Sequence, residues 1–176
     1  PHVEDFESWR DSGYPNVKFE TREFIDNVLK PDKKWKMWNH QIEGLLRTIY
    51  AYEVLGKKNC LLNIVTGGGK TAIIGAVIFW LKSVHNINKF LILTPNTIVR
   101  ARLIQDFKDG VVFKNFEFPT KQNQVLLNDL GLHVMEAGSQ PQGMLDSGII
   151  LGNIQQMYSS NIGGKRNLAY IQEFVG

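Results

Sequence analysis

Three consecutive glycines followed by lysine and threonine constrain the fold of this chain more than any other feature. The run Gly67–Thr71 follows a mostly apolar stretch, residues 60–65, and leads into a second apolar stretch, residues 72–81. The first stretch has the length and composition of a buried strand, whereas the second is long enough for a helix. We therefore predict a strand over 60–65, a glycine loop, and a buried helix over about 70–85.

The order of strand, glycine loop and helix is what a site for nucleotide phosphates requires. Glycines let backbone N–H groups approach phosphate oxygens without a Cβ in the way. The following helix adds unpaired N–H groups and the positive end of its dipole. Lys70 is expected to reach the β- and γ-phosphates, and the Thr71 hydroxyl to bind Mg²⁺. The alternative is a glycine-rich turn with an incidental Lys-Thr pair, but both flanks favour a nucleoside triphosphate site.

Length and composition fit a globular domain and exclude several other classes. The chain has 176 residues, of which 43% are hydrophobic, so it can bury a core. Its longest apolar run is too short to cross a bilayer, and its first residues carry no secretory pattern. The single cysteine, Cys60, is expected to be a buried strand residue in a reducing compartment, so we predict a cytoplasmic protein. The four histidines lack metal-ligand spacing, and a net charge of +3 permits nucleic-acid binding without establishing it.

The spacing of apolar residues predicts the remaining elements. Two strand–helix units in succession, 60–85 and 89–108, indicate a parallel sheet with right-handed crossovers. Two short helices are expected upstream, one capped by Thr21 and the other capped by Asn39. Weaker patterns predict short strands at 111–113 and 116–118, a helix at 121–130, strands at 132–135 and 149–151, and helix at 167–175.

Aromatic and basic residues gather in the first half of the chain, and each has a functional and a structural interpretation. Trp80 is predicted to lie in the core, and packing is also favoured over base stacking for Trp9, Trp35 and Trp38. The cluster 33–36, Lys-Lys-Trp-Lys, mixes charge and aromatic character as binders of single-stranded nucleic acid do. A solvated basic linker is the favoured interpretation of this cluster.

Three further segments accompany the glycine loop. Residues 35–41 precede it, residues 93–99 follow it, and residues 150–155 end a predicted strand. In this order the segments resemble the first motor domain of superfamily 2 (DEAD/DEAH-like) helicases and translocases. The resemblance is greatest to the ATP-dependent restriction subunits of type III and type I enzymes. It implies an α/β fold of the RecA-like kind, incomplete, with a parallel sheet flanked by helices.

The resemblance also implies domain boundaries and residue roles. A small helical extension is expected over residues 1–34 and the first ATP-binding domain over residues 35–176. Gln41 matches the glutamine that reads the adenine edge, and His40 or Trp38 would stack on the base. The nucleotide motif is matched by Thr66, Gly67, Gly68, Gly69, Lys70 and Thr71. The backbone of the tracked DNA strand would be contacted by Pro95, Asn96, Thr97, Asn153 and Gln155.

Cofactors and partners follow from the same resemblance. It implies ATP and Mg²⁺, double-stranded DNA held by its backbone, a second motor domain in the same parent chain, and a methyltransferase or specificity subunit. The family needs an acidic pair at a strand end, to hold Mg²⁺ and to activate water. No apolar strand here ends in Asp-Glu, and the nearest segment, residues 125–129, has one acid. We expect the acidic pair beyond Gly176, so that this chain binds ATP without hydrolysing it.

Two other functions remain open on the sequence alone. A small-molecule or nucleotide kinase would use the same glycine loop but needs an arginine-bearing lid, and residues 110–148 contain no arginine. The second alternative is a non-catalytic DNA-binding module that keeps a relic of a nucleotide fold. Salt-dependent DNA binding without nucleotide affinity would favour that module.

Overall fold

The computed structural model describes residues 3–135 and 146–157 of the chain. The chain is divided into two compact units, one made of residues up to 85 together with 113–120, and the other of residues 86–112 together with those from 121 onward. Each unit buries its own set of apolar side chains. The helix predicted at 167–175 lies outside the described residues.

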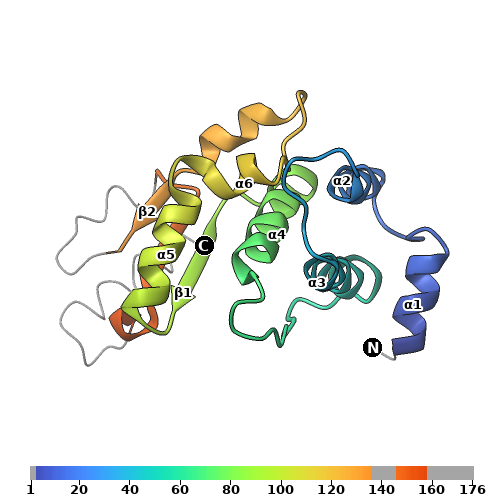
Figure 1. Ribbon diagram of the computed structural model, residues 1–176, viewed down its shortest axis with the longest axis horizontal. Helices are drawn as coiled ribbons and strands as arrows, with labels where there is room; N and C mark the ends of the chain where they lie inside the picture. The colour runs from blue at the N-terminus through green and yellow to red at the C-terminus, as the bar shows by residue number, and fades with distance from the viewer. Residues whose placement is uncertain (1–2, 136–145, 158–176) are drawn as a thin grey trace. The chain divides into compact units, whose positions relative to one another are not determined.

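The first unit is helical, and its central element is α4 (Lys70–His85). Both α2 (Phe19–Leu29) and α3 (Asn39–Ile49) pack against α4, as Figure 1 shows. α3 continues into a π-helical turn, η1 (Tyr50–Val54). The predicted helix over 70–85 is confirmed, and because its sequence is apolar nearly all round, it is buried on several sides.

The N-terminal helix α1 (Val3–Asp11) adds an aromatic contact to this unit. The rings of Phe6 and Trp9 lie 5.8 and 5.0 Å from the ring of Tyr50, and the Arg47 guanidinium lies 4.2 Å from the ring of Phe6. Aromatic pairs at such distances contribute beyond the area they bury. Packing is therefore confirmed for Trp9, as it is for Trp80, whose side chain is fully buried.

The prediction that Thr21 caps the second helix is wrong. α2 begins two residues earlier, and Thr21 is fully buried. Its hydroxyl accepts a hydrogen bond from Trp80 Nε1 at 2.9 Å and donates one to Glu53 Oε1 at 2.6 Å. The same carboxylate oxygen lies 2.7 Å from His85 Nε2. A buried carboxylate is tolerated only when it is paired and hydrogen-bonded, so the hydroxyl serves this network instead of a helix end.

Residues 113–120 return to the first unit, where two side chains bind their carbonyl oxygens. Asn27 Nδ2 donates to the carbonyls of Glu117 and Phe118, at 3.1 and 3.0 Å. Lys33 Nζ donates to the carbonyls of Phe116 and Glu117, both at 2.9 Å. Lys33 is only 8% exposed, so the prediction of a solvated linker is wrong at this residue. Burial lowers the pKa of Lys33 from its ordinary value of 10.5 to about 8.

The prediction of strands at 111–113 and 116–118 is wrong as well. The first is part of a short helix, α6 (Val111–Asn115), and the second is a turn in which Glu117 has a φ of 49°. A strand needs its carbonyls for a neighbouring strand, but here the side chains of Asn27 and Lys33 bind them.

The second unit contains a three-stranded parallel sheet with the strand order β1-β3-β2. Its strands are β1 (Phe90–Thr94), β2 (Leu132–Val134) and β3 (Ile149–Asn153). The central strand β3 is buried along its whole length. The three strands confirm the predictions for 89–94, 132–135 and 149–151, and the fold is α/β with a small parallel sheet.

Helical segments accompany this sheet. α5 (Thr97–Phe107) packs against all three strands (Figure 1) and buries Leu103 and Phe107, which confirms the helix predicted there. It continues into the 3₁₀ turn η2 (Lys108–Gly110). The helix predicted at 121–130 is a 3₁₀ helix, η3 (Gln124–Asp129), and a further turn, η4 (Ile154–Met157), follows β3.

The strand predicted over residues 60–65 does not form, although these residues are all described. Leu61 is 93% exposed and Val65 is 78% exposed, and Cys60, predicted to be buried, is exposed too. A strand is stable only when its backbone groups pair with a neighbour, and none of the three described strands pairs with this segment. The apolar pattern is present, but the pairing that would bury it is absent from the described part of the chain.

Replacing Thr21 tests the buried network. Thr21→Val leaves the Trp80 N–H and one Glu53 contact unsatisfied, so the free energy of unfolding should fall by about 3 kcal/mol. Thr21→Ser keeps the hydroxyl and should lose less than half of that amount. Tryptophan fluorescence, recorded during urea unfolding, reports the unfolding of the first unit alone, since all four tryptophans of the chain lie there. Equal losses in the two variants would contradict the role of the hydroxyl.

The lowered pKa of Lys33 predicts that the stability of the fold depends on pH. The fold releases its proton near pH 8, whereas the unfolded chain keeps that proton up to about 10.5. The unfolded state therefore binds more protons between these values, and the contribution of Lys33 to the free energy of unfolding should rise with pH across this window. Urea unfolding from pH 7 to 10 should show this rise in the wild type and in Lys34→Met, whose lysine is exposed, but not in Lys33→Met. Parallel curves for all three proteins would refute the assignment.

Candidate functional site

The glycine loop has a backbone that only glycine adopts easily. Gly67 and Gly69 have φ values of 84° and 68°, in the left-handed region that side chains disfavour. The N–H of Gly68 donates to the carbonyl of Val65 at 3.1 Å, which closes a tight turn. The loop ends at the first residue of the 16-residue helix α4. The positive end of this helix dipole therefore lies at the loop, where an anion would be stabilised.

Close packing adds a second reason for glycine at two of these positions. A Cβ on Gly69 would overlap the side-chain amide of Gln41. A Cβ on Gly68 would lie 2.7 Å from Cγ2 of Ile64, closer than carbon atoms approach one another without displacement. The loop is thus shaped by α3 on one side and by residues 64–65 on the other.

Gln41 is the residue through which α3 contacts the loop. Its Nε2 donates to the carbonyls of Gly68 and Gly69, at 3.3 and 3.4 Å, and its Oε1 accepts from the backbone N–H of Trp38 at 2.8 Å. The predicted cap, Asn39, is therefore wrong: α3 begins at Asn39 and its cap is Trp38, because the Gln41 side chain binds the N–H of Trp38. Gln41 is 4% exposed. The structure places it beside the glycine loop, while its adenine-reading role stays a prediction.

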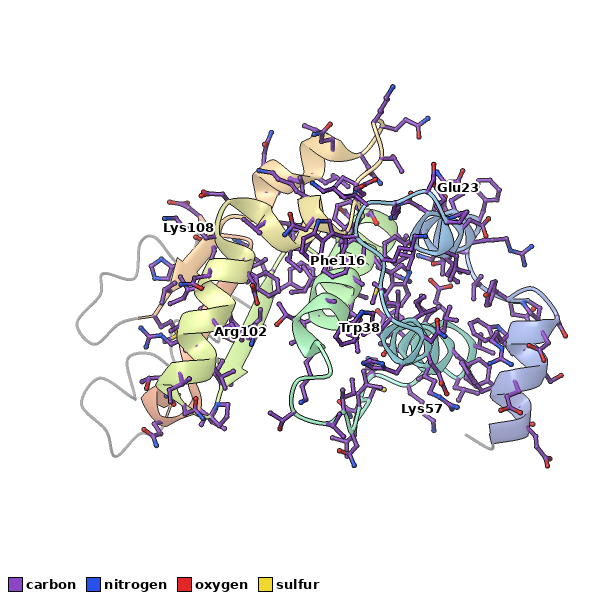
Figure 2. The ribbon with its side chains drawn as sticks, in the orientation of Figure 1. Glu23, Trp38, Lys57, Arg102, Lys108 and Phe116 are labelled. Carbon is purple, nitrogen blue, oxygen red and sulfur yellow. The ribbon has the colours of Figure 1, made fainter. Side chains whose placement is uncertain are left out.

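His40 makes a loop contact that the sequence did not indicate. Its Nε2 lies 2.8 Å from the carbonyl of Gly68, and because a carbonyl only accepts, the ring nitrogen donates. The sequence suggested His40 only as a residue that stacks on a base, and a lone histidine beside a glutamine gives no signal for a backbone contact. The ring of Trp38 lies 5.6 Å from that of His40, at the start of α3 where Figure 2 labels it. Trp38 and Trp35 are both largely exposed, so the packing predicted for these two is wrong.

Lys70 and Thr71 occupy the first turn of α4. Lys70 is exposed, and its Nζ donates to the carbonyl of Val65 at 3.0 Å. Thr71 is half-buried. Within residues 3–135 and 146–157, no three His, Cys, Asp or Glu side chains are grouped so that they could hold a metal ion. The predicted Mg²⁺ would thus have Thr71 as its ligand from this loop, together with phosphate oxygens and water.

The residues predicted to contact DNA lie together in the second unit. In the parallel register Thr94 is opposite Asn153, so the segments after β1 and after β3 leave the same edge of the sheet. Asn96 Oδ1 accepts from the N–H of Val99 at 2.9 Å and caps α5. Asn153 Oδ1 accepts from the N–H of Gln155, also at 2.9 Å. Each segment is thereby folded into a turn by the oxygen of its own asparagine.

The first of these turns keeps several groups that could bind a phosphate. Pro95, Asn96 and Thr97 are exposed. The cap uses the oxygen of Asn96, so its amide NH₂ can donate elsewhere, as can backbone N–H groups in the first turn of α5. Arg102 is exposed on the same helix and is labelled in Figure 2. The positive end of the helix dipole and these donors suit a phosphate backbone.

Gly69→Ala tests the glycine loop. Its Cβ would overlap Gln41, and the left-handed backbone would be strained, so the affinity for a fluorescent ATP analogue should fall at least tenfold. Gly131→Ala is the matched control, because no atom lies within 4 Å of a Cβ at that position. An ATP analogue bound equally by both variants and the wild type would contradict the loop assignment.

No helix in the described ranges is long and apolar enough to cross a membrane. Comparison with known families matches residues 34–174 to the model of the type III restriction enzyme, res subunit. No curated protein and no solved structure matches the chain. The matched stretch includes the glycine loop and both turns at the sheet edge, which are the features whose geometry suits phosphate binding. A match over most of the chain shows the family, and this chain belongs to that of the type III restriction enzyme res subunit.

Proposed function

We propose that this chain is the ATP-binding part of a DNA-dependent ATPase, a helicase or translocase of the restriction-enzyme type. The observation that carries the proposal is the glycine loop at the start of α4, where Gly67 and Gly69 have a left-handed backbone and Gly68 and Gly69 are closely packed. Such a loop suits the close approach of a phosphate group, so the residues present fit a bound nucleotide. Membership in the res subunit family supports the same conclusion.

Lys70 exchanges one partner for another when the nucleotide binds. Its ammonium donates to the Val65 carbonyl in the structure. We infer that it leaves this neutral acceptor for the β- and γ-phosphates, because their negative charge adds a Coulomb attraction to the ammonium that a carbonyl does not supply. The loop N–H groups hold the β-phosphate, and Thr71 binds Mg²⁺. Gln41 reads the adenine edge, next to the loop carbonyls that it already contacts.

The proposed polymer partner is double-stranded DNA, held by its backbone in the second unit. Pro95, Asn96 and Thr97 contribute one set of donors, and Asn153 and Gln155 contribute the other. Neutral donors and backbone N–H groups fix the position of a protein on DNA without reading sequence, which is what a translocating motor needs. We further propose a cytoplasmic protein whose parent chain supplies a second motor domain and works with a methyltransferase or specificity subunit.

Hydrolysis requires groups that the described strands do not supply. The three strands end at Thr94, Val134 and Asn153, and none of these positions carries an acidic pair. We propose that the chain by itself binds ATP and does not turn it over, since the acidic pair and an arginine finger come from elsewhere in the parent protein. An arginine finger alone raises the turnover rate about 10³–10⁵-fold.

Lys70→Ala tests the proposed function. Nucleotide binding should be lost while helicity and melting temperature stay unchanged, because the Lys70 side chain is exposed. Lys57→Ala removes another exposed lysine of the same unit and should bind the ATP analogue as the wild type does. Titration with a fluorescent analogue and Mg²⁺ measures both variants. Unchanged affinity in Lys70→Ala would refute nucleotide binding at this loop, and salt-dependent DNA binding would then favour a non-catalytic DNA-binding module.

A further inference from the structure

The last residue of β1, Thr94, joins the two turns that leave the sheet edge. It is 2% exposed, and its hydroxyl lies 3.3 Å from the carbonyl oxygen of Asn96 and 3.3 Å from that of Gly152. The first carbonyl belongs to the turn after β1, and the second belongs to β3, next to the turn that Asn153 begins. One hydroxyl proton is therefore shared between acceptors on two separate segments.

This arrangement affects the spacing of the turns more than their internal shape. Each turn is already folded by its own asparagine oxygen, through the bond to Val99 in one and to Gln155 in the other. Two carbonyl oxygens that face the same point repel each other unless a donor lies between them. The Thr94 hydroxyl is such a donor, and its β-branched side chain has few rotamers, so the donor stays in place.

We propose that Thr94 is a positioning residue that sets the distance between the two DNA-contacting turns. The inference rests on the proposed function, because it assumes that both turns bind one DNA backbone. Phosphates along a strand have a fixed spacing, so donors on two turns bind together only when their separation matches it. Without the hydroxyl the carbonyls move apart, and one turn loses its contact while the other keeps it.

Three variants at this position separate the hydroxyl from the packing. Thr94→Val keeps the shape and removes the donor, and we expect about tenfold weaker binding to a short DNA duplex, the loss of one hydrogen bond to a charged group. Thr94→Ser keeps the donor and should bind within about twofold of the wild type. Thr94→Ala removes the donor without placing a methyl group against the two carbonyls, and it replaces Thr94→Val if that variant does not fold.

A matched control tests whether any lost hydroxyl has this effect. Thr48 donates to the carbonyl of Gly44 at 2.8 Å inside α3, in the other unit. Thr48→Val removes the same kind of bond, and its DNA affinity should equal that of the wild type. Fluorescence anisotropy of a labelled duplex at fixed salt measures the DNA affinity of each protein. Circular dichroism shows that each variant is folded.

A double-mutant cycle distinguishes positioning from a general loss of stability. Gln155→Ala should weaken binding about tenfold in the wild type but less than about twofold in Thr94→Val, since the turn after β3 has then already lost its contact. Wild-type affinity in Thr94→Val, or losses that add fully with Gln155→Ala, would overturn the inference while leaving DNA binding intact. If the wild-type chain does not bind the duplex, the proposed DNA function fails first, and the inference fails with it.

Discussion

The side-chain amide of Gln41 links the start of α3 to the glycine loop, and the geometry of the nucleotide site depends on this link. One side of the amide binds the N–H of Trp38 and thereby begins the helix, while the other side binds two loop carbonyls. α3 packs against α4, which the loop precedes directly, so loop and helices form one structural unit. The glycine requirement at Gly69 follows from this contact as much as from backbone conformation.

In the second unit a parallel sheet, instead of a helix pair, brings distant segments of the chain together. Parallel register brings two chain segments, more than fifty residues apart in sequence, to neighbouring positions at one edge. Asn96, just after β1, and Asn153, the last residue of β3, fold the turns that follow, a structural role in addition to the DNA contact that the resemblance implies. For Asn96, both roles are compatible, because an asparagine that caps through its oxygen still has an amide group that can donate.

Local patterns in the sequence were sufficient for the elements that depend on neighbours in the chain. The helix after Lys70, the strand 89–94 and the helix over about 97–108 were predicted from apolar spacing. Thr21 was not predicted correctly, since its hydroxyl serves two partners that lie 32 and 59 residues further along. The turn at 116–118 depends on Asn27 and Lys33 in the same way. Periodicity carries no information about such distant partners.

The candidate site divides along the same line. The glycines, Lys70 and the paired strand ends follow from motif and topology. The contacts of His40 and Gln41 with loop carbonyls join residues that lie almost thirty positions apart, and no local pattern indicates them.

The segment 60–65 is largely exposed to solvent. It pairs with none of the described strands, and Leu61 and Val65 are exposed on it, so another extended segment can pair with it. In concentrated solution, copies of the chain would therefore tend to associate through this segment, and purification at low protein concentration would favour the monomer.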